Sequence, residues 1–194
     1  SMSGSFGEMH VPPTLVSFAV TTLDADQVVS NEFKQAGSKV VLFDAPPKAD
    51  LTPDYGLLRA QFGRVKTLLR EKRALSAAAV TTLAATAAKS CFGNGLGFTF
   101  EQECDLFRYR PGAIIAELKQ GEPVPEGAAL LGYVTVEQVL TAGDVSVSMN
   151  ALREGWEKTL DKVFPAAVRQ EGDNGNRPLY RERSAHRPAQ SFAR

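Results

Sequence analysis

The sequence predicts an α+β domain in which helices pack on a mixed β-sheet, and three observations support this fold class. Short apolar and β-branched runs recur along the chain, longer segments carry apolar residues at helical spacing, and several strand-like runs lie close together late in the sequence. The chain has 194 residues, 43% of them hydrophobic, which suffices for one buried core. We expect a folded domain at residues 11–168, after a tag remnant and flexible start at residues 1–10 and before a polar linker at residues 169–194.

Two runs in the first quarter of the chain are predicted to be strands. A proline pair at positions 12 and 13 prevents a helix, and residues 14–20 then have the unbroken apolar character of a strand buried on both faces. Residues 39–44 repeat this character and stop before a second proline pair. Both runs are therefore expected inside the sheet.

The region from residue 52 to about residue 72 is predicted to be the first helix. Thr52, Pro53 and Asp54 have the capping, backbone and charge preferences of a helix start. Apolar residues then recur at spacings of four, three and four, while basic residues line much of the other side. The predicted inward positions are Leu58, Phe62, Val65 and Leu69.

A short apolar run at residues 75–80 precedes a second predicted helix. Thr81 or Thr82 can cap this helix, and its inward side chains are mostly small, which permits close packing on a sheet. The sequence Phe92-Gly93-Asn94-Gly95 ends the helix, because glycine and asparagine tolerate left-handed backbone. The predicted inward positions are Leu83, Ala87, Ala88 and Cys91.

The second half of the chain is predicted to hold further strands and a last helix. Residues 96–101 and 129–134 are strand candidates, and residues 105–109 and 113–118 are expected to pair as a hairpin through Arg110-Pro111-Gly112. Large apolar residues at every fourth position then mark a helix that Pro165 ends. These positions are Leu152, Trp156, Leu160 and Phe164.

Composition and charge narrow the classes of function. Lysine plus arginine equals aspartate plus glutamate at 22 each, so no positive field favours a nucleic acid or an acidic membrane surface. No apolar run approaches the roughly 20 residues of a membrane span, and the first residues lack a signal-peptide pattern. We therefore expect a cytoplasmic protein with no nucleic acid and no membrane partner.

Few residues are suited to metal binding or nucleophilic catalysis. Cys91 and Cys104 lack metal-type spacing, and His10 and His186 lie in opposite polar tails. Cys91 falls on the inward face of the second helix, where a cysteine usually acts as a small apolar residue. We predict no metal site and no catalytic residue in this chain.

Four segments resemble the phosphoribosylformylglycinamidine synthases, and they occur in the order found in that family. They are residues 11–18, which begin Val11-Pro12-Pro13; residues 31–40, which begin Asn31-Glu32-Phe33; residues 88–97, which contain Cys91-Phe92-Gly93-Asn94-Gly95; and residues 156–165, which end Val163-Phe164-Pro165. Each segment is short, and their shared order across residues 11–165 makes the match specific.

The resemblance implies a fold like that of the C-terminal domain of aminoimidazole ribonucleotide synthetase. It implies the last lobe of the second synthase half, in an enzyme that uses ATP, Mg²⁺ and glutamine to convert formylglycinamide ribonucleotide into an amidine during purine biosynthesis. The implied partners are a preceding ATP-binding lobe and a following glutaminase domain of the same polypeptide. Such a lobe is expected to frame the active site, to bind no cofactor tightly, to be inactive alone and to self-associate.

Two candidates for anion binding remain in the chain. Where related lobes often carry an Asp-Gly-Gly turn, this chain has Thr81-Thr82-Leu83-Ala84, whose side chains obstruct a phosphate. One candidate is a backbone nest, with a plain helix stop as the simpler interpretation; its residues are Gly93, Asn94, Gly95 and Gly97. The other is the pair Arg108 and Arg110, with solvated turn positions as the simpler interpretation.

Two other interpretations stay open. One is another ATP-dependent enzyme of the same superfamily, such as a thiamine-monophosphate or selenophosphate enzyme, which the closing helix and the polar linker disfavour. The other is a free-standing module that binds a nucleotide or a protein.

Overall fold

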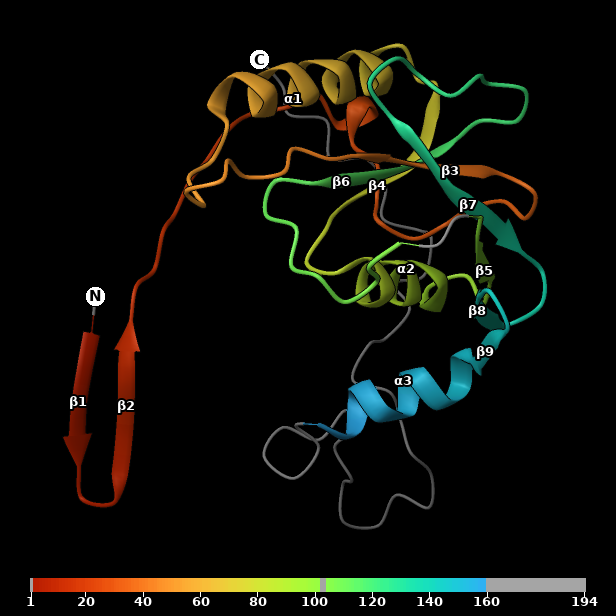
Figure 1. Ribbon diagram of the computed structural model, residues 1–194. Coiled ribbons are helices and arrows are strands. Elements are labelled where there is room, and N and C mark those ends of the chain that lie inside the picture. Colours follow the sequence, from red (N-terminus) through yellow and green to blue (C-terminus); the bar gives the residue numbers. More distant parts are fainter. Residues whose placement is uncertain (1, 102–103, 160–194) are drawn as a thin grey trace, which may run out of the picture.

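The fold is an α+β domain, as the sequence predicts (Figure 1). The computed structural model describes residues 2–101 and 104–159. Their elements are, in order, β1 (Met2–Phe6), β2 (Met9–Thr14), a 3₁₀ turn (Ala25–Gln27), β3 (Lys39–Phe43), α1 (Tyr55–Arg70), β4 (Ala74–Ala79), α2 (Leu83–Phe92), β5 (Gly97–Phe100), β6 (Ile114–Leu118), β7 (Ala129–Thr135), β8 (Val139–Ala142), β9 (Val145–Ser148) and α3 (Met149–Lys158).

Seven strands form one mixed sheet in the order β4-β6-β3-β7-β5-β8-β9. Neighbouring strands are antiparallel except for β5 and β8, which run parallel. β1 and β2 form a separate antiparallel hairpin at the start of the chain, which lies apart from the sheet in Figure 1. The sequence analysis did not predict this hairpin.

Successive residues of the sheet point to opposite faces, so each strand contributes to two cores. Val40 belongs to a core shared with α2 and α3, whereas Val41 belongs to a core shared with α1. On β6, Ile115 belongs to the core shared with α2 and α3, and Ala116 to the core shared with α1. The sheet is therefore a central layer, with α1 on one face and α2 and α3 on the other (Figure 1).

α1 begins after Asp54, whose side chain accepts a hydrogen bond of 3.0 Å from the Leu57 amide, so the predicted start is confirmed. Its buried face differs from the predicted one, because Phe62 is 47% exposed while Gln61 is buried. The Gln61 amide donates to the backbone carbonyls of Asp44 and Gly127, each at 2.9 Å. These bonds compensate the burial of a polar side chain and set the rotation of the helix.

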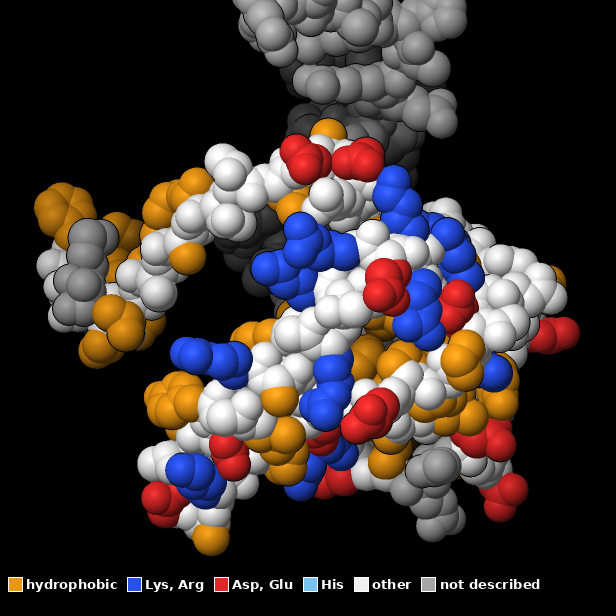
Figure 2. All heavy atoms as spheres, turned by 90° about the horizontal axis from the view of Figure 1, so that it is seen from above, with side chains coloured by type: hydrophobic (Ala, Val, Ile, Leu, Met, Phe, Trp, Pro, Cys, Tyr) orange, Lys and Arg blue, Asp and Glu red, His pale blue; other side chains and the backbone are white. Residues whose placement is uncertain are grey.

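The outer side of α1 is solvated and carries charges of both signs. Figure 2 looks down on this side of the molecule and shows lysine and arginine side chains interspersed with acidic ones. Just beyond the helix, Arg73 pairs with Glu122 at 2.7 Å and with Glu71 at 3.2 Å. Among the described residues, no helix combines the length and the apolar character needed to cross a bilayer.

The N-cap, the inward face and the C-terminal end of α2 are as predicted. Thr82 is the N-cap, and its hydroxyl accepts a hydrogen bond from the Ala85 amide at 3.3 Å. All four predicted inward residues of this helix are buried. The predicted strands at residues 39–44, 96–101 and 129–134 are likewise confirmed as β3, β5 and β7.

Two predicted strands are wrong. Residues 15–20 have no regular structure and pair with no strand among the described residues, although apolar side chains dominate there. Residues 105–109 also form no strand, so the predicted hairpin with β6 is absent. Asp105 prevents it, because its carboxylate accepts hydrogen bonds from the amides of Phe107 and Arg108 and folds the segment into a turn.

The sequence analysis missed β8 and β9, which are joined through Gly143 and Asp144. Gly143 has a φ of 55°, a conformation that glycine adopts without strain. The last predicted helix is confirmed as α3 over its described part. Leu160, Phe164, Pro165 and the linker at residues 169–194 lie outside the described residues.

Candidate functional site

The N-terminal end of α2, at Thr81-Thr82-Leu83-Ala84, is closed by the chain itself. The Ala84 amide donates to the Leu106 carbonyl at 3.1 Å, and the Ala85 amide donates to the Thr82 hydroxyl. These backbone donors would otherwise attract a phosphate at a helix start. A ligand at this end would therefore have to displace the loop that carries Leu106.

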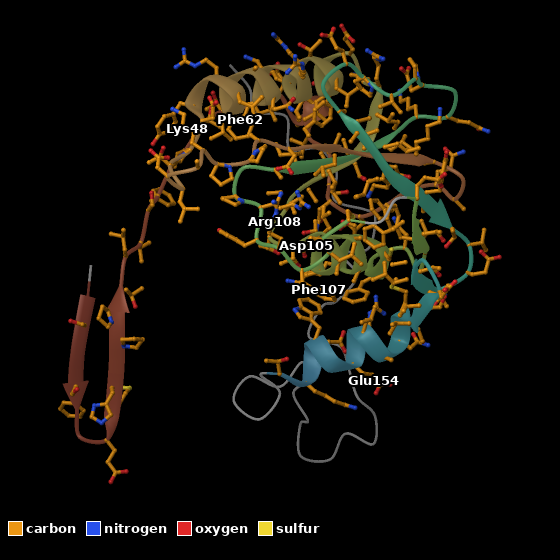
Figure 3. All side chains as sticks on the ribbon, viewed as in Figure 1. Lys48, Phe62, Asp105, Phe107, Arg108 and Glu154 are labelled. Atoms are coloured by element: carbon orange, nitrogen blue, oxygen red, sulfur yellow. The ribbon has the colours of Figure 1, made fainter. Side chains whose placement is uncertain are left out.

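Arg110 lies beside this closed helix end and has an internal partner. Its side chain is only 9% exposed, and it forms an ion pair with Asp44 at the end of β3. Arg108 is exposed on the adjacent loop, 3.8 Å from the same carboxylate (Figure 3). Asp44 and Asp105 balance the two arginines in number, so the cluster has no excess of positive charge with which to bind an anion.

The glycine turn after α2 has the geometry of a helix stop. The Leu96 amide donates to the Cys91 carbonyl at 3.2 Å, and Gly95 between them has a φ of 63°. The Asn94 side-chain amide donates to the Phe33 carbonyl at 2.7 Å. A side chain at Gly97 would overlap the carbonyl oxygen of Glu137, so this glycine allows two backbones to approach closely.

The two anion candidates lie at opposite ends of α2. The helix has ten residues and is therefore about 15 Å long. The backbone amide of Arg110 donates to the Thr81 carbonyl just before the helix, whereas Gly93 follows its last residue. The structure does not bring the predicted site residues together into one site.

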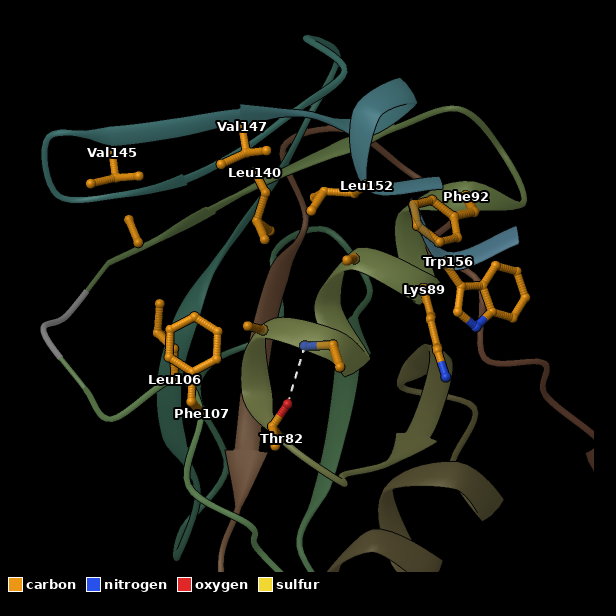
Figure 4. A pocket seen from close by; sticks show the side chains of 14 residues that line it. Thr82, Lys89, Phe92, Leu106, Phe107, Leu140, Val145, Val147, Leu152 and Trp156 are labelled. Carbon is orange, nitrogen blue, oxygen red and sulfur yellow. Dashed lines mark hydrogen bonds between the residues drawn. The ribbon is translucent and has the colours of Figure 1, made fainter. Parts of the chain in front are cut away.

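An apolar groove of about 490 Å³ lies on the described residues (Figure 4). α2 forms one side of it, and β8, β9, α3 and the loop at Leu106 and Phe107 form the others. Its fourteen lining residues are Thr82, Ala84, Ala85, Ala88, Lys89, Phe92, Leu106, Phe107, Leu140, Ala142, Val145, Val147, Leu152 and Trp156. We call this feature the α2 groove.

One end of the α2 groove is aromatic. Trp156 of α3 stacks on Phe92 of α2 with ring centroids 5.8 Å apart, and the Lys89 ammonium lies 5.3 Å from the Trp156 ring centroid. Lys89 is the one charged residue in the lining. A cation over an indole ring contributes about 0.5 to 1 kcal/mol when exposed.

The chemistry available in the α2 groove is binding rather than catalysis. Its lining contains neither a pair of carboxylates nor a nucleophile beside a base, which acid–base or covalent catalysis requires. Within residues 2–101 and 104–159, no group of three or more histidine, cysteine, aspartate or glutamate side chains could hold a metal ion. The groove is suited to an apolar surface.

Sequence reasoning missed the α2 groove because it missed β8 and β9. The signal was present, since Val145 and Val147 alternate with serines after Gly143 and Asp144, which is the pattern of a hairpin strand. Trp156 was identified only as a packing position of the last helix, but 54% of it is exposed.

Cys91 is a core residue and not a nucleophile. Burial raises the pKa of its thiol to about 12, and the nearby Glu117 charge adds to this increase. Because the pKa is raised, the thiolate that reacts with disulfide reagents is not populated between pH 7 and 9. Cys104 is only partly buried, and burial raises its pKa as well.

We therefore expect the folded chain at pH 8 to react slowly at Cys104 and not at Cys91. Ellman's reagent should release one equivalent of chromophore from the native chain and a second only after unfolding in urea. A Cys104→Ser variant should show no reaction until it is unfolded. Rapid reaction of that variant in buffer would show that the Cys91 thiol is accessible.

Comparison with known proteins bears on the fold. No protein-family model matches the sequence, and no curated protein matches it. Solved structures do match. Thermotoga maritima PurL complexed with ATP superposes with a TM-score of 0.54 at 10% identity, covering 66% of this chain and 27% of that chain.

Two other structures from Thermotoga maritima agree. PurLQS gives a TM-score of 0.56 at 12% identity, covering 67% of this chain and 28% of that chain. Phosphoribosylformylglycinamidine synthase II gives a TM-score of 0.55 at 12% identity, covering 81% of this chain and 31% of that chain. This chain thus spans less than a third of the length of each. At such identities the likeness concerns the fold, and the described domain has a fold found in the phosphoribosylformylglycinamidine synthases, as the sequence predicted.

Proposed function

We propose that this chain acts as the last synthase lobe of a phosphoribosylformylglycinamidine synthase, an ATP-dependent enzyme that forms a carbon–nitrogen bond. The shared fold carries the proposal, since two thirds of this chain superpose on less than a third of PurL. The four ordered segments at residues 11–165 support the same family. The complete enzyme would use ATP, Mg²⁺ and glutamine in the cytoplasm.

The role we assign to the lobe is to frame the active site. Three observations support this: the start of α2 is closed by the Leu106 loop, Arg110 is paired with Asp44, and the α2 groove has no acid–base pair. Chemistry on the substrate would then depend on a preceding ATP-binding lobe and a following glutaminase domain of the same polypeptide. The lobe alone would bind no cofactor tightly.

The test compares this chain with the polypeptide encoded by its complete native reading frame. We expect the complete polypeptide to form the amidine from formylglycinamide ribonucleotide, ATP, Mg²⁺ and glutamine, and an internal deletion of residues 31–159 to abolish turnover. This chain by itself should show neither turnover nor heat on calorimetric titration with ATP. Thermotoga maritima PurLQS serves as the positive control. A complete polypeptide that leaves this substrate unchanged would exclude the proposal.

A further inference from the structure

The segment at residues 15–23, which we call the strap, leaves the domain without regular structure (Figure 1), and its large apolar side chains are exposed. Leu15, Val16, Phe18 and Val20 are each between 77% and 87% exposed. No residue of the strap is charged. A contiguous apolar segment with this exposure marks an interaction surface.

The α2 groove lies next to an open edge of the sheet. β9 is the last strand at that edge among the described residues, and its Val145 and Val147 line the groove. An edge strand presents unpaired backbone N–H and C=O groups to any strand that is added beside it. A strand bound there would have both backbone partners and an apolar surface for its side chains.

Three large side chains of the strap fall at alternate positions. Val16, Phe18 and Val20 would lie on one face of an extended strap, with Leu15, Ser17 and Ala19 on the other. We propose that the strap of one copy of this chain binds as an added strand beside β9 of a second copy, with its large side chains in the α2 groove. Phe18, the largest residue of the strap, lies at the centre of this contact.

The strap is anchored far from the groove of its own copy. Asp26 pairs with Lys72 just before β4, and the Ser30 carbonyl accepts a hydrogen bond from Ala77 of β4. Residues 21–23 of the strap line a hollow with Phe62 and Leu69 of α1, on the face of the sheet opposite the α2 groove. Phe18 lies five residues before Leu23, an extended reach of about 17 Å, which does not carry it around the sheet to its own groove. A second copy has no such constraint.

A reciprocal exchange also gives an interface of sufficient size. Each copy contributes the fourteen residues of the α2 groove and the nine residues of the strap. Together these fall within the roughly 20 to 30 residues per side found in specific interfaces. The exchange also stops at the dimer, because each copy uses its strap and its groove once, both with the same partner.

Sedimentation equilibrium of the 194-residue chain tests this contact. We expect the wild-type chain to dimerise, and Phe18→Asp and Val145→Asp each to weaken the dimer at least tenfold, because each places a charge in an apolar contact. Matched controls are Phe6→Asp, an exposed aromatic outside the strap, and Ser146→Asp, on the face of β9 opposite Val145. Both controls should dimerise like the wild type. Circular dichroism of every variant verifies that the sheet is formed.

Mixing the two defective variants distinguishes an exchanged strap from nonspecific association. Phe18→Asp keeps an intact groove and Val145→Asp keeps an intact strap, so the mixture can form one complete contact. The mixture should therefore contain a heterodimer that neither variant forms with itself at the same concentration. A wild-type chain that stays monomeric at the highest concentration, a Phe18→Asp variant that dimerises like the wild type, or a mixture without heterodimer would each overturn the proposal.

Discussion

Replacing Glu117 with alanine is expected to lower the free energy of unfolding by about 3 to 5 kcal/mol. Glu117 is fully buried on β6, and its carboxylate accepts hydrogen bonds from the amides of Lys34 and Gln35 at 2.8 and 2.9 Å. The hydroxyl of Ser76 on β4 donates to it at 3.0 Å. Alanine would leave the buried Ser76 hydroxyl and the part-buried amides of Lys34 and Gln35 without their acceptor, and an unsatisfied buried donor costs about 1 to 3 kcal/mol.

Urea denaturation followed by circular dichroism measures this effect. A Glu117→Gln variant should lose about half as much stability as Glu117→Ala, because the amide keeps one acceptor oxygen but turns an N–H group toward a donor. Glu137→Ala, at an exposed position after β7, is the matched control and should change stability by less than about 0.5 kcal/mol. Equal stabilities for Glu117→Ala and the control would show that the carboxylate does not hold the loop.

Replacing Phe98 with alanine is the second change of large expected effect, at about 3 to 5 kcal/mol. Phe98 on β5 is fully buried, and its ring centroid lies 5.5 Å from that of Phe33 and 4.9 Å from that of Phe100. The substitution removes transfer energy, leaves a cavity between the sheet and α2, and breaks two aromatic pairs. The same denaturation experiment measures the loss.

Phe107 provides the comparison, because it is a phenylalanine on an exposed loop. Its replacement with alanine should change the free energy of unfolding by no more than about 0.5 kcal/mol. If Phe98→Ala and Phe107→Ala had similar effects, the aromatic cluster would not be the centre of this core.

The sequence predicted those elements whose signals are local. Thr82 and the Gly93–Gly95 stop bracket α2 within fourteen residues, and both ends are observed as expected. The rotation of α1 was missed because the acceptors of Gln61 lie at Asp44 and Gly127, far away in the chain. Counting hydrophobic positions cannot detect a polar side chain whose burial depends on distant carbonyl groups.

The candidate site was less predictable than the fold for the same reason. Arg110 was expected to be solvated at a turn, whereas the distant Asp44 makes it a buried ion-pair partner. The α2 groove needs α2, α3 and the β8–β9 hairpin together, and no single segment shows it. Residues 14–20 are strongly apolar, but a run of this kind does not show whether it pairs within the sheet.

The pairing of β3 has a consequence for how the chain folds as it is synthesised. β3 is paired on both edges, yet both partners come much later: Phe43 pairs with Ile114, and Leu42 pairs with Ala129. During translation the middle of the sheet must therefore wait until β7 has left the ribosome. Until then both edges of an apolar strand are open to pairing with other chains.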